Sequence, residues 1–460
     1  MAKVTFNELA INNLNDFVYG HAPKKIKFDN GMVIGGGTVY PEVNFTLPPM
    51  QVNKNTISKA YKQYKEMTEG VCQRAMELQV PGLVIEIELV PDMTLNPEWG
   101  IETTKIVKEV MNEYQDKNGL KSLLRITPVD VREGNDLEHM WRGKHWDLVM
   151  DTFKGCAENG ADLLSIESVG GKNLHDDGVM FCDVAKTVFS LGIVAARDME
   201  KLWENIVKIA EETNIIPAGD TACAFANTSM VLAVRGMIPT VFSAIDRVMC
   251  AVRTMIANEQ GAIGPDKDCG YEGPYIKAIT GTPISMEGKS AAVAHNSFCG
   301  NIAAAVADLW SNEAVENKRL LGGMTPEICT EMLVYDCRLM NQFTASGNNL
   351  LMRDMLVESD SRLDAHAYIM KPSVVLNIAK EIIKGKTHLE RTKIAAKAAV
   401  QEIRKGFENG SLELNERELN YLNMIDSQLE SIPDNEEEFI ADMIENNTTE
   451  KFDPKKYDIA

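Results

Sequence analysis

The chain has 460 residues, of which 45% are hydrophobic and 25% are charged, and these ordinary values exclude a disordered or a fibrous protein. Asp and Glu number 67 against 47 Lys and Arg, so the formal net charge of −20 excludes nucleic acid and anionic membrane as general partners. The first residues lack the apolar core of a secretion signal, no apolar run is long enough to cross a membrane, and the nine cysteines show no dense spacing, so we expect a cytoplasmic protein.

The first segment of the chain, residues 1–54, is predicted to be an N-terminal cap. It contains three consecutive glycines, Gly35–Gly37, followed by the alternating pattern VYPEVNF. Glycine permits the backbone conformations of tight turns, and alternation is typical of strands, so we expect a hairpin or a cap over a barrel mouth. The glycine run is interpreted as a turn and not as a phosphate-binding loop.

Helical and strand patterns then alternate over residues 55–370. A helix at about 55–78 leads to the apolar run GLVIEIEL, and the same succession repeats along the chain. The expected strands are 82–89, 122–131, 161–168, 192–197, 214–220 and 290–297. Helices between strands imply parallel βαβ units. Because at least six such units occur and no G-x-G-x-x-G follows a strand, we predict an α/β fold, a closed (β/α)₈ TIM barrel, rather than an open doubly wound sheet.

The last segment, residues 371–460, is predicted to be a helical C-terminal extension. Two helical patterns, at 374–385 and 387–407, are followed by the acidic run DNEEE at 434–438. Runs of like charge usually form a solvated surface, so no function is assigned to this one.

Three residues near predicted strand ends have the chemistry of metal ligands. Glu167 ends the strand at 161–168, Cys223 follows the strand at 214–220, and Cys269 lies in a Gly- and Asp-rich loop. The carboxyl ends of barrel strands meet at one mouth, so these side chains can share a ligand. Two thiolates and one carboxylate are a credible three-ligand set for Zn²⁺ with a fourth position open, whereas Mg²⁺ and Ca²⁺ prefer oxygen.

Structural roles compete with this interpretation. Cysteine is often simply buried, and this alternative stays open for Cys223 and Cys269 when each is taken alone. A rival metal pair is His295 and Cys299, although the HNS sequence there also resembles a helix cap. Burial is sufficient to explain the cysteines in helix-like stretches, which are Cys72, Cys156, Cys182, Cys250, Cys329 and Cys337.

Other polar residues close to predicted strand ends have less specific assignments. The loop with His175, Asp176 and Asp177 is expected to shape a binding surface. Asp220, three residues before Cys223, could hydrogen-bond a ligand, donate a proton or cap a helix.

Four stretches carry a family resemblance. They are GGGTVYPEVNFTLPP near the N-terminus, then SIES, GDTACAFANT and GPDKDCGYEGPY in that order. With these motifs and its length, the chain resembles the zinc-containing methanol:corrinoid methyltransferases of methanogenic archaea along its whole length. The resemblance implies a TIM barrel with helical additions, one Zn²⁺ per subunit held by a carboxylate and two cysteines, and a tight oligomeric complex with a separate corrinoid-binding protein. On matching positions the ligands would be Glu167, Cys223 and Cys269.

The chemistry of methanol agrees with what the resemblance implies. Hydroxide is a poor leaving group, so transfer of the methyl group to the cobalt(I) of a partner's corrinoid, a step of methanogenesis from methanol, needs a Lewis acid such as Zn²⁺ on the oxygen. A proton donor is also expected, and Asp220 or a water is the hypothesis. The sequence has no D-x-H-x-x-G pattern to bind a corrinoid, so the corrinoid is expected to come from the partner, docked at the barrel mouth.

Two other classes of function stay open from the residues alone. A metal-independent barrel enzyme, for instance a decarboxylase, would use Glu86, Glu88 or Arg125 and would carry no stoichiometric zinc. A non-catalytic scaffold subunit would tolerate alanine at all three predicted ligand positions.

Overall fold

The computed structural model of the protein describes residues 3–47, 50–132, 137–267, 271–314, 317–447 and 452–459. In these residues a curled parallel sheet has the spatial order β7-β6-β5-β4-β3-β9-β8. The strands are β3 (Tyr40–Phe45), β4 (Leu83–Glu88), β5 (Ser122–Thr127), β6 (Leu163–Ile166), β7 (Ile216–Asp220), β8 (Ser285–Glu287) and β9 (Leu309–Glu313).

A short extended segment occupies the remaining gap between the edge strands β7 and β8. The amide of Ile263 donates to Pro217 O of β7 at 2.9 Å, and the amide of Ser285 in β8 donates to Asp266 O at 2.8 Å. Asp266 and Ile284 also form a parallel bridge. Residues 263–267 therefore take the eighth position of the ring, and the predicted (β/α)₈ barrel is confirmed.

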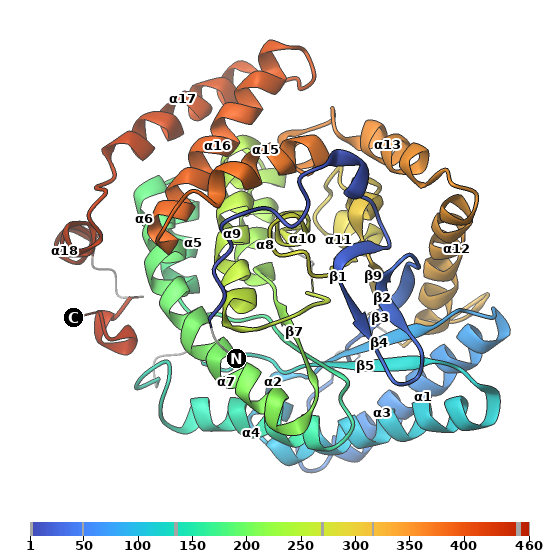
Figure 1. Cartoon of the computed structure of the whole chain (residues 1–460). Helices are drawn as coiled ribbons and strands as arrows, with labels where there is room; N and C mark the ends of the chain where they lie inside the picture. The colour runs from blue at the N-terminus through green and yellow to red at the C-terminus, as the bar shows by residue number, and fades with distance from the viewer. Residues whose placement is uncertain are drawn as a thin grey trace.

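Long helices surround the sheet, as Figure 1 shows. Along the chain, α12 packs on α1, α1 on α3, α3 on α4, α4 on α7 and α7 on α9. Parallel strands buried on both faces need such a cover, which explains apolar strand sequences such as LVIEIE and SLLRIT. These helices are α1 (Ile57–Glu77), α3 (Pro97–Asn118), α4 (Lys144–Glu158), α7 (Ala195–Thr213), α9 (Thr240–Gln260) and α12 (Thr325–Ala345).

Shorter elements follow the strands or join the helices. They are α2 (Pro91–Thr94), α5 (Lys172–Met180), α6 (Val184–Phe189), α8 (Cys223–Val234), α10 (Gly273–Thr280), α11 (Lys289–Ala294), α13 (Asn349–Asp360), β10 (Arg319–Leu320) and β11 (Gly323–Met324).

The C-terminal helices lie against the side of the barrel. Helix α16 packs on α9, and α15 packs on α10 and α16. Figure 1 shows this group in orange and red beside the green helices. The elements after residue 364 are α14 (Ala365–Ile369), α15 (Pro372–Ile382), α16 (His388–Glu408), α17 (Glu416–Ser431) and α18 (Glu436–Asn447). None of the helices described is both long and apolar enough to cross a bilayer.

The N-terminal region differs from its prediction. A hairpin is present, formed by β1 (His21–Lys27) and β2 (Val33–Gly36). Its residues Met32 and Ile34 pack on the amino ends of the barrel strands, however, and not at the mouth. The pattern VYPEVNF is not part of this hairpin. It forms β3, which pairs with β4 and β9 in the centre of the sheet, so a boundary at residue 54 would remove a barrel strand.

Two further expected strands are helical. Gly192–Arg197 lies in a π-helical turn, Ser190–Val194, that continues into α7, and the pattern at 290–297 begins in α11. Both stretches are short apolar runs, and apolar runs of this length do not distinguish a buried strand from a buried helix. Strands β8 and β9 were not predicted.

Candidate functional site

The interior of the barrel is apolar at the amino end of the strands and polar toward the carboxyl end. Next to the apolar residues, the buried Arg125 donates from Nε to Glu42 Oε1 at 2.7 Å and from Nη1 to Ser165 Oγ at 2.7 Å. These partners come from β3, β5 and β6, so the hydrogen bonds cross the inside of the barrel. This network fills the interior of the barrel directly beneath the mouth. The mouth itself is formed at the carboxyl ends of the strands.

Three carboxylates, two from β4 and one from the end of β6, surround one buried lysine at the mouth. Lys267 Nζ lies 3.1 Å from Glu86 Oε1 and 3.0 Å from Glu167 Oε1, and it also contacts Glu88. Burial alone would lower the pKa of Lys267, but the three carboxylates outweigh burial and raise that pKa well above its usual value. The lysine is therefore a fixed positive charge among acids.

Two more carboxyl groups at the mouth have displaced pKa values. Burial, reinforced by Glu313, raises the pKa of Glu287 to about 8. Burial, reinforced by Glu88, raises the pKa of Glu313 to about 7 against the opposing charge of Lys267. Carboxyl groups that are partly protonated near neutral pH can donate protons, so the mouth holds acids as well as bases.

Glu167 lies at the edge of an open cavity. It follows β6 directly and forms a parallel bridge with Val129, and its side chain is 31% exposed. The cavity has a volume of about 270 Å³. Residues from the ends of β4, β5 and β6 line it together with Ala224, the neighbour of Cys223.

Cys223 is the first residue of α8 and is partly exposed. The amide of Thr221, two residues earlier, donates to Ile166 O at 3.3 Å, so the start of α8 lies beside the strand end that carries Glu167. Asn227 Nδ2 lies 2.7 Å from Cys223 Sγ. A metal would bind this sulfur as the thiolate.

Cys269 falls outside the described residues, but the chain on either side of it is described. On one side is Lys267, with its contact to Glu167. On the other side is Glu272, whose Oε1 accepts hydrogen bonds from the amide of Ala222 and, at 3.2 Å, from Thr221 Oγ1. The two flanks of residues 268–270 thus contact the surroundings of the other two predicted ligands.

Asp220 is fully buried and does not line the cavity. Its Oδ2 accepts from Trp203 Nε1 at 2.9 Å, and its Oδ1 lies 3.2 Å from Arg253 Nη1. Arg253 Nη2 also donates to Ser168 O at 3.0 Å, which joins the ends of β6 and β7. Burial raises the pKa of Asp220, and Arg253 opposes the rise.

The loop residues His175, Asp176 and Asp177 lie in α5. His175 is fully buried, with Nε2 2.8 Å from Asp246 Oδ1, and Cys250 completes a cluster whose potential ligand atoms all lie within 4.8 Å of one another. Burial opposes protonation, yet Asp246 and Asp176 raise the pKa of His175 to about 8. No local sequence pattern marks this cluster, because 71 residues separate its hydrogen-bonded partners.

The rival pair His295 and Cys299 follows α11 and is not on one helical face. Cys299 is buried, and burial raises the pKa of its thiol above the usual range. This agrees with a structural role for the thiol. The six cysteines assigned to the core are buried except Cys329, which is partly exposed.

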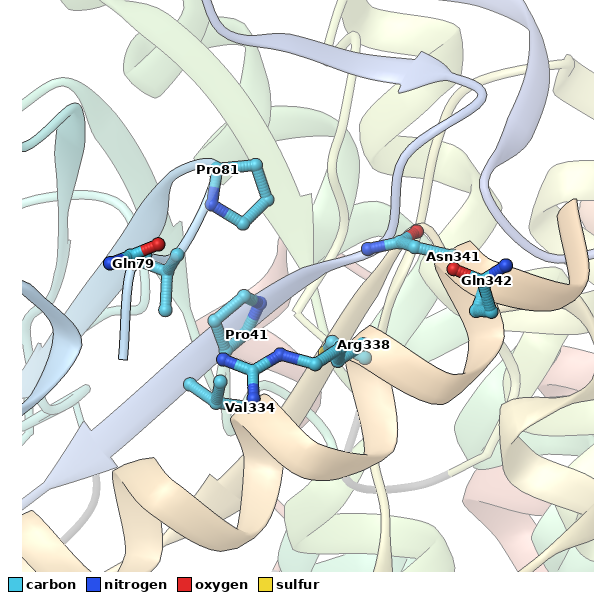
Figure 2. A pocket seen from close by; sticks show the side chains of 9 residues that line it. Pro41, Gln79, Pro81, Val334, Arg338, Asn341 and Gln342 are labelled. Atoms are coloured by element: carbon cyan, nitrogen blue, oxygen red, sulfur yellow. The ribbon is translucent and has the colours of Figure 1, made fainter. Parts of the chain in front are cut away.

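A second cavity lies near the amino end of β3, between the end of α1 and α12 (Figure 2). The side chain of Asn341 pairs with the backbone of Val39 at 2.8 and 2.9 Å, and Arg338 Nη2 donates to Leu78 O at 2.5 Å. Figure 2 shows that prolines and amides make up much of the remaining lining. Its polar groups hold α12 to the barrel, so this cavity has a structural explanation.

Comparisons with known proteins agree along the whole chain. The family model described as "Methanol-cobalamin methyltransferase B subunit" (MtaB) matches residues 3–458. The methanol–corrinoid protein co-methyltransferase of Methanosarcina barkeri (strain Fusaro / DSM 804) is 36% identical over 463 residues, covering 99% of this chain and 100% of that protein. Among solved structures, a chain of the methanol:cobalamin methyltransferase complex MtaBC from Methanosarcina barkeri superposes with a TM-score of 0.94 and 35% identity over 100% of both chains.

Proposed function

Because the chain belongs to the methanol-cobalamin methyltransferase B subunit family and is a methyltransferase, we propose that it transfers the methyl group of methanol to the cobalt(I) corrinoid of a partner protein, as a step of methanogenesis in the cytoplasm. We further propose that the reaction depends on one Zn²⁺ per subunit, held by Glu167, Cys223 and Cys269. The observation that carries the metal proposal is the 3.3 Å hydrogen bond from Thr221 N to Ile166 O, which puts the start of α8 beside Glu167.

The residues at the mouth fit a resident Zn²⁺. Glu167 is partly exposed at the cavity, and its Oε1 already faces a cation, the ammonium of Lys267 at 3.0 Å. Cys223 begins α8, where the positive end of the helix dipole favours a thiolate. A carboxylate with two thiolates suits Zn²⁺ and does not suit Mg²⁺ or Ca²⁺.

Zn²⁺, when bound, supplies Lewis-acid polarisation of the methanol C–O bond, and the partner's corrinoid supplies the cobalt(I) nucleophile. The chain contributes the geometry around them. Glu167 and the two cysteines would hold the metal, and the cavity beside Glu167 would leave room for methanol. A docked partner would cover the mouth and exclude water.

The proton for the departing oxygen has two candidate sources in the chain. Asp220 is the candidate nearest to Cys223 in the sequence, but Trp203 and Arg253 contact both of its carboxylate oxygens. Glu313 lies at the mouth, and its pKa of about 7 leaves it partly protonated near neutral pH. Of these two groups, Glu313 lies at the mouth and is partly exposed, whereas Asp220 is fully buried.

The Asp220 hypothesis predicts a large loss of turnover in Asp220→Asn, about 10²-fold for removal of a general acid, with the metal retained. Metal content and the rate of methyl transfer from methanol would be measured on the same preparation. Unchanged turnover with full metal content would remove Asp220 from the mechanism and leave Glu313 as the candidate.

The experiment that tests the proposal is methylation of an added cobalt(I) corrinoid protein by methanol, with reduced wild type, Cys223→Ser and Cys269→Ser. Loss of a metal ligand is expected to lower the rate roughly 10³-fold or more, because the Lewis acid supplies several kcal/mol of stabilisation. Cys329→Ser is the matched control, since Cys329 is also partly exposed but lies in α12.

The same experiment separates the other classes of function. A metal-independent enzyme would retain its rate in both ligand variants and would carry no zinc. Arg125 is a poor candidate for the catalytic group of such an enzyme, because its guanidinium lies beneath the mouth and already donates hydrogen bonds to Glu42 and Ser165. A scaffold subunit would support no methanol-dependent methylation in any variant.

A further inference from the structure

Glu272 is a buried carboxylate that has no ion-pair partner among the described residues. Its side chain is almost completely inaccessible, with 1% of the residue surface exposed. Burying a carboxylate is costly unless hydrogen bonds compensate. Its Oε1 accepts three hydrogen bonds. Its Oε2 is buried and has no hydrogen-bond partner in the part of the chain that the structure describes. The group therefore needs an explanation beyond packing.

The donors to Glu272 Oε1 come from two neighbouring elements. The amide of Ala222 and the hydroxyl of Thr221, the latter at 3.2 Å, precede Cys223 directly, and Thr254 Oγ1 on α9 donates at 3.2 Å. Ala222 is the N-cap residue of α8, and its own side chain cannot cap the helix. Glu272 thus supplies, from 50 residues away, the anionic cap at the helix end where Cys223 lies.

Glu272 also stands three residues after Cys269. The segment 268–270 is therefore flanked by two anchored residues with different partners. Lys267 Nζ reaches Glu167 Oε1 at 3.0 Å, and Glu272 reaches the two residues before Cys223. Lys267 thus contacts the predicted ligand Glu167, Glu272 contacts the two residues that precede Cys223, and both anchors lie within three residues of Cys269 in the sequence.

We propose that Glu272 is a positioning residue that fixes the turn before Cys223 against α9, so that the Cys223 thiolate is preorganised for the metal. The inference rests on the proposed zinc site and deepens it. Outer groups that fix metal ligands affect affinity because, without them, binding must also order the ligands.

The test is a titration of reduced, metal-free full-length protein with Co²⁺, followed by the thiolate-to-cobalt charge-transfer absorbance, and by competition with Zn²⁺. Glu272→Ala is expected to weaken metal affinity by about 10- to 100-fold, the usual cost of losing an outer-shell partner. Glu272→Gln retains the oxygen that accepts all three hydrogen bonds and is expected to restore affinity close to that of the wild type.

Glu418→Ala is the matched control. Glu418 accepts from the amides of Thr240 and Val241 at 3.1 and 2.8 Å and so also caps a helix from a distance, but it caps α9. Its removal is expected to leave Co²⁺ affinity unchanged. If Glu272→Ala does not fold, Thr221→Val tests the same link, because it removes one donor to Glu272, and a smaller loss of affinity is expected.

Wild-type affinity and charge-transfer intensity in Glu272→Ala, or in Thr221→Val where the alanine variant does not fold, would overturn the inference. An equal loss in Glu418→Ala would also overturn it, because the effect would then be general destabilisation. Failure of the zinc site itself has another signature, which is the absence of charge transfer in the wild type.

Discussion

The two ends of this barrel are built from the same strands and have opposite chemistry. At the amino end, Met32 and Ile34 of the hairpin close the barrel against Tyr40, Leu123 and other apolar residues. At the carboxyl end, Glu86 and Glu88 of β4 and Glu167 after β6 surround the buried Lys267. The difference indicates that the amino end contributes mainly stability and the carboxyl end mainly chemistry. A change at the amino end should therefore leave activity intact, and a change at the carboxyl end should leave stability intact.

The largest expected effect comes from a change at the mouth. Glu167→Gln removes a carboxylate that is partly exposed, so it should lower methyl transfer by roughly 10³-fold with loss of metal. In the metal-free protein the free energy of unfolding should change by less than about 1 kcal/mol, because Glu86 and Glu88 still compensate the charge of Lys267. Activity, metal content and denaturant unfolding would be measured together, and a large loss of stability would break the comparison.

The next effect in size comes from the amino end. The side chain of Ile34 is fully buried, so Ile34→Ala leaves a cavity in its place and should lower the free energy of unfolding by about 2–5 kcal/mol. Metal content and turnover per folded molecule should stay those of the wild type. Denaturant titration and an activity assay on the folded protein check both, and a parallel fall in metal content would show that the two ends are coupled.

The smallest effect is a dependence on pH. The pKa of Glu287 is raised to about 8, mainly by burial and also by Glu313, so the folded protein loses stability as pH rises from the ordinary glutamate range through 8 and this carboxyl group ionises. Glu287→Gln cannot ionise and should lack this loss. With allowance for partial exposure, its gain over the wild type should be of the order of 1 kcal/mol at pH 8 and near zero at about pH 5.

Unfolding midpoints of both proteins at several pH values measure this difference. Equal midpoints at every pH would mean that the side chain of Glu287 is solvated, and that the mouth is less enclosed than the structure indicates.

The barrel could be predicted from strands β4 to β7, because their apolar runs stand between clear amphipathic helices. The sequence was misleading for β3, where Glu42 and Asn44 gave an alternating pattern. Both are buried, since they point into a polar barrel interior and not toward solvent. Strand β8 has only three residues and offers too little pattern to detect.

The site could be predicted only where chemistry coincides with a strand end. Glu167 and Cys223 were predicted as ligands in this way, and their role stays a prediction. Lys267 and Glu272 were not, because their partners are 100 and 50 residues away and nothing local marks a residue that acts across the barrel. Their contacts exist only because the strands close into a ring. Hydrophobic periodicity predicts that ring, but it does not predict which residues meet across it.

The most direct test of the central claim is X-ray absorption at the zinc edge of the reduced wild-type protein, together with its zinc content. The account predicts about one zinc per chain with two sulfur ligands at about 2.3 Å and oxygen ligands at about 2.0–2.2 Å. A zinc bound by imidazole nitrogen would contradict it and point to the buried cluster of His175, Asp246 and Cys250. Active protein without zinc would contradict the metal-dependent mechanism altogether.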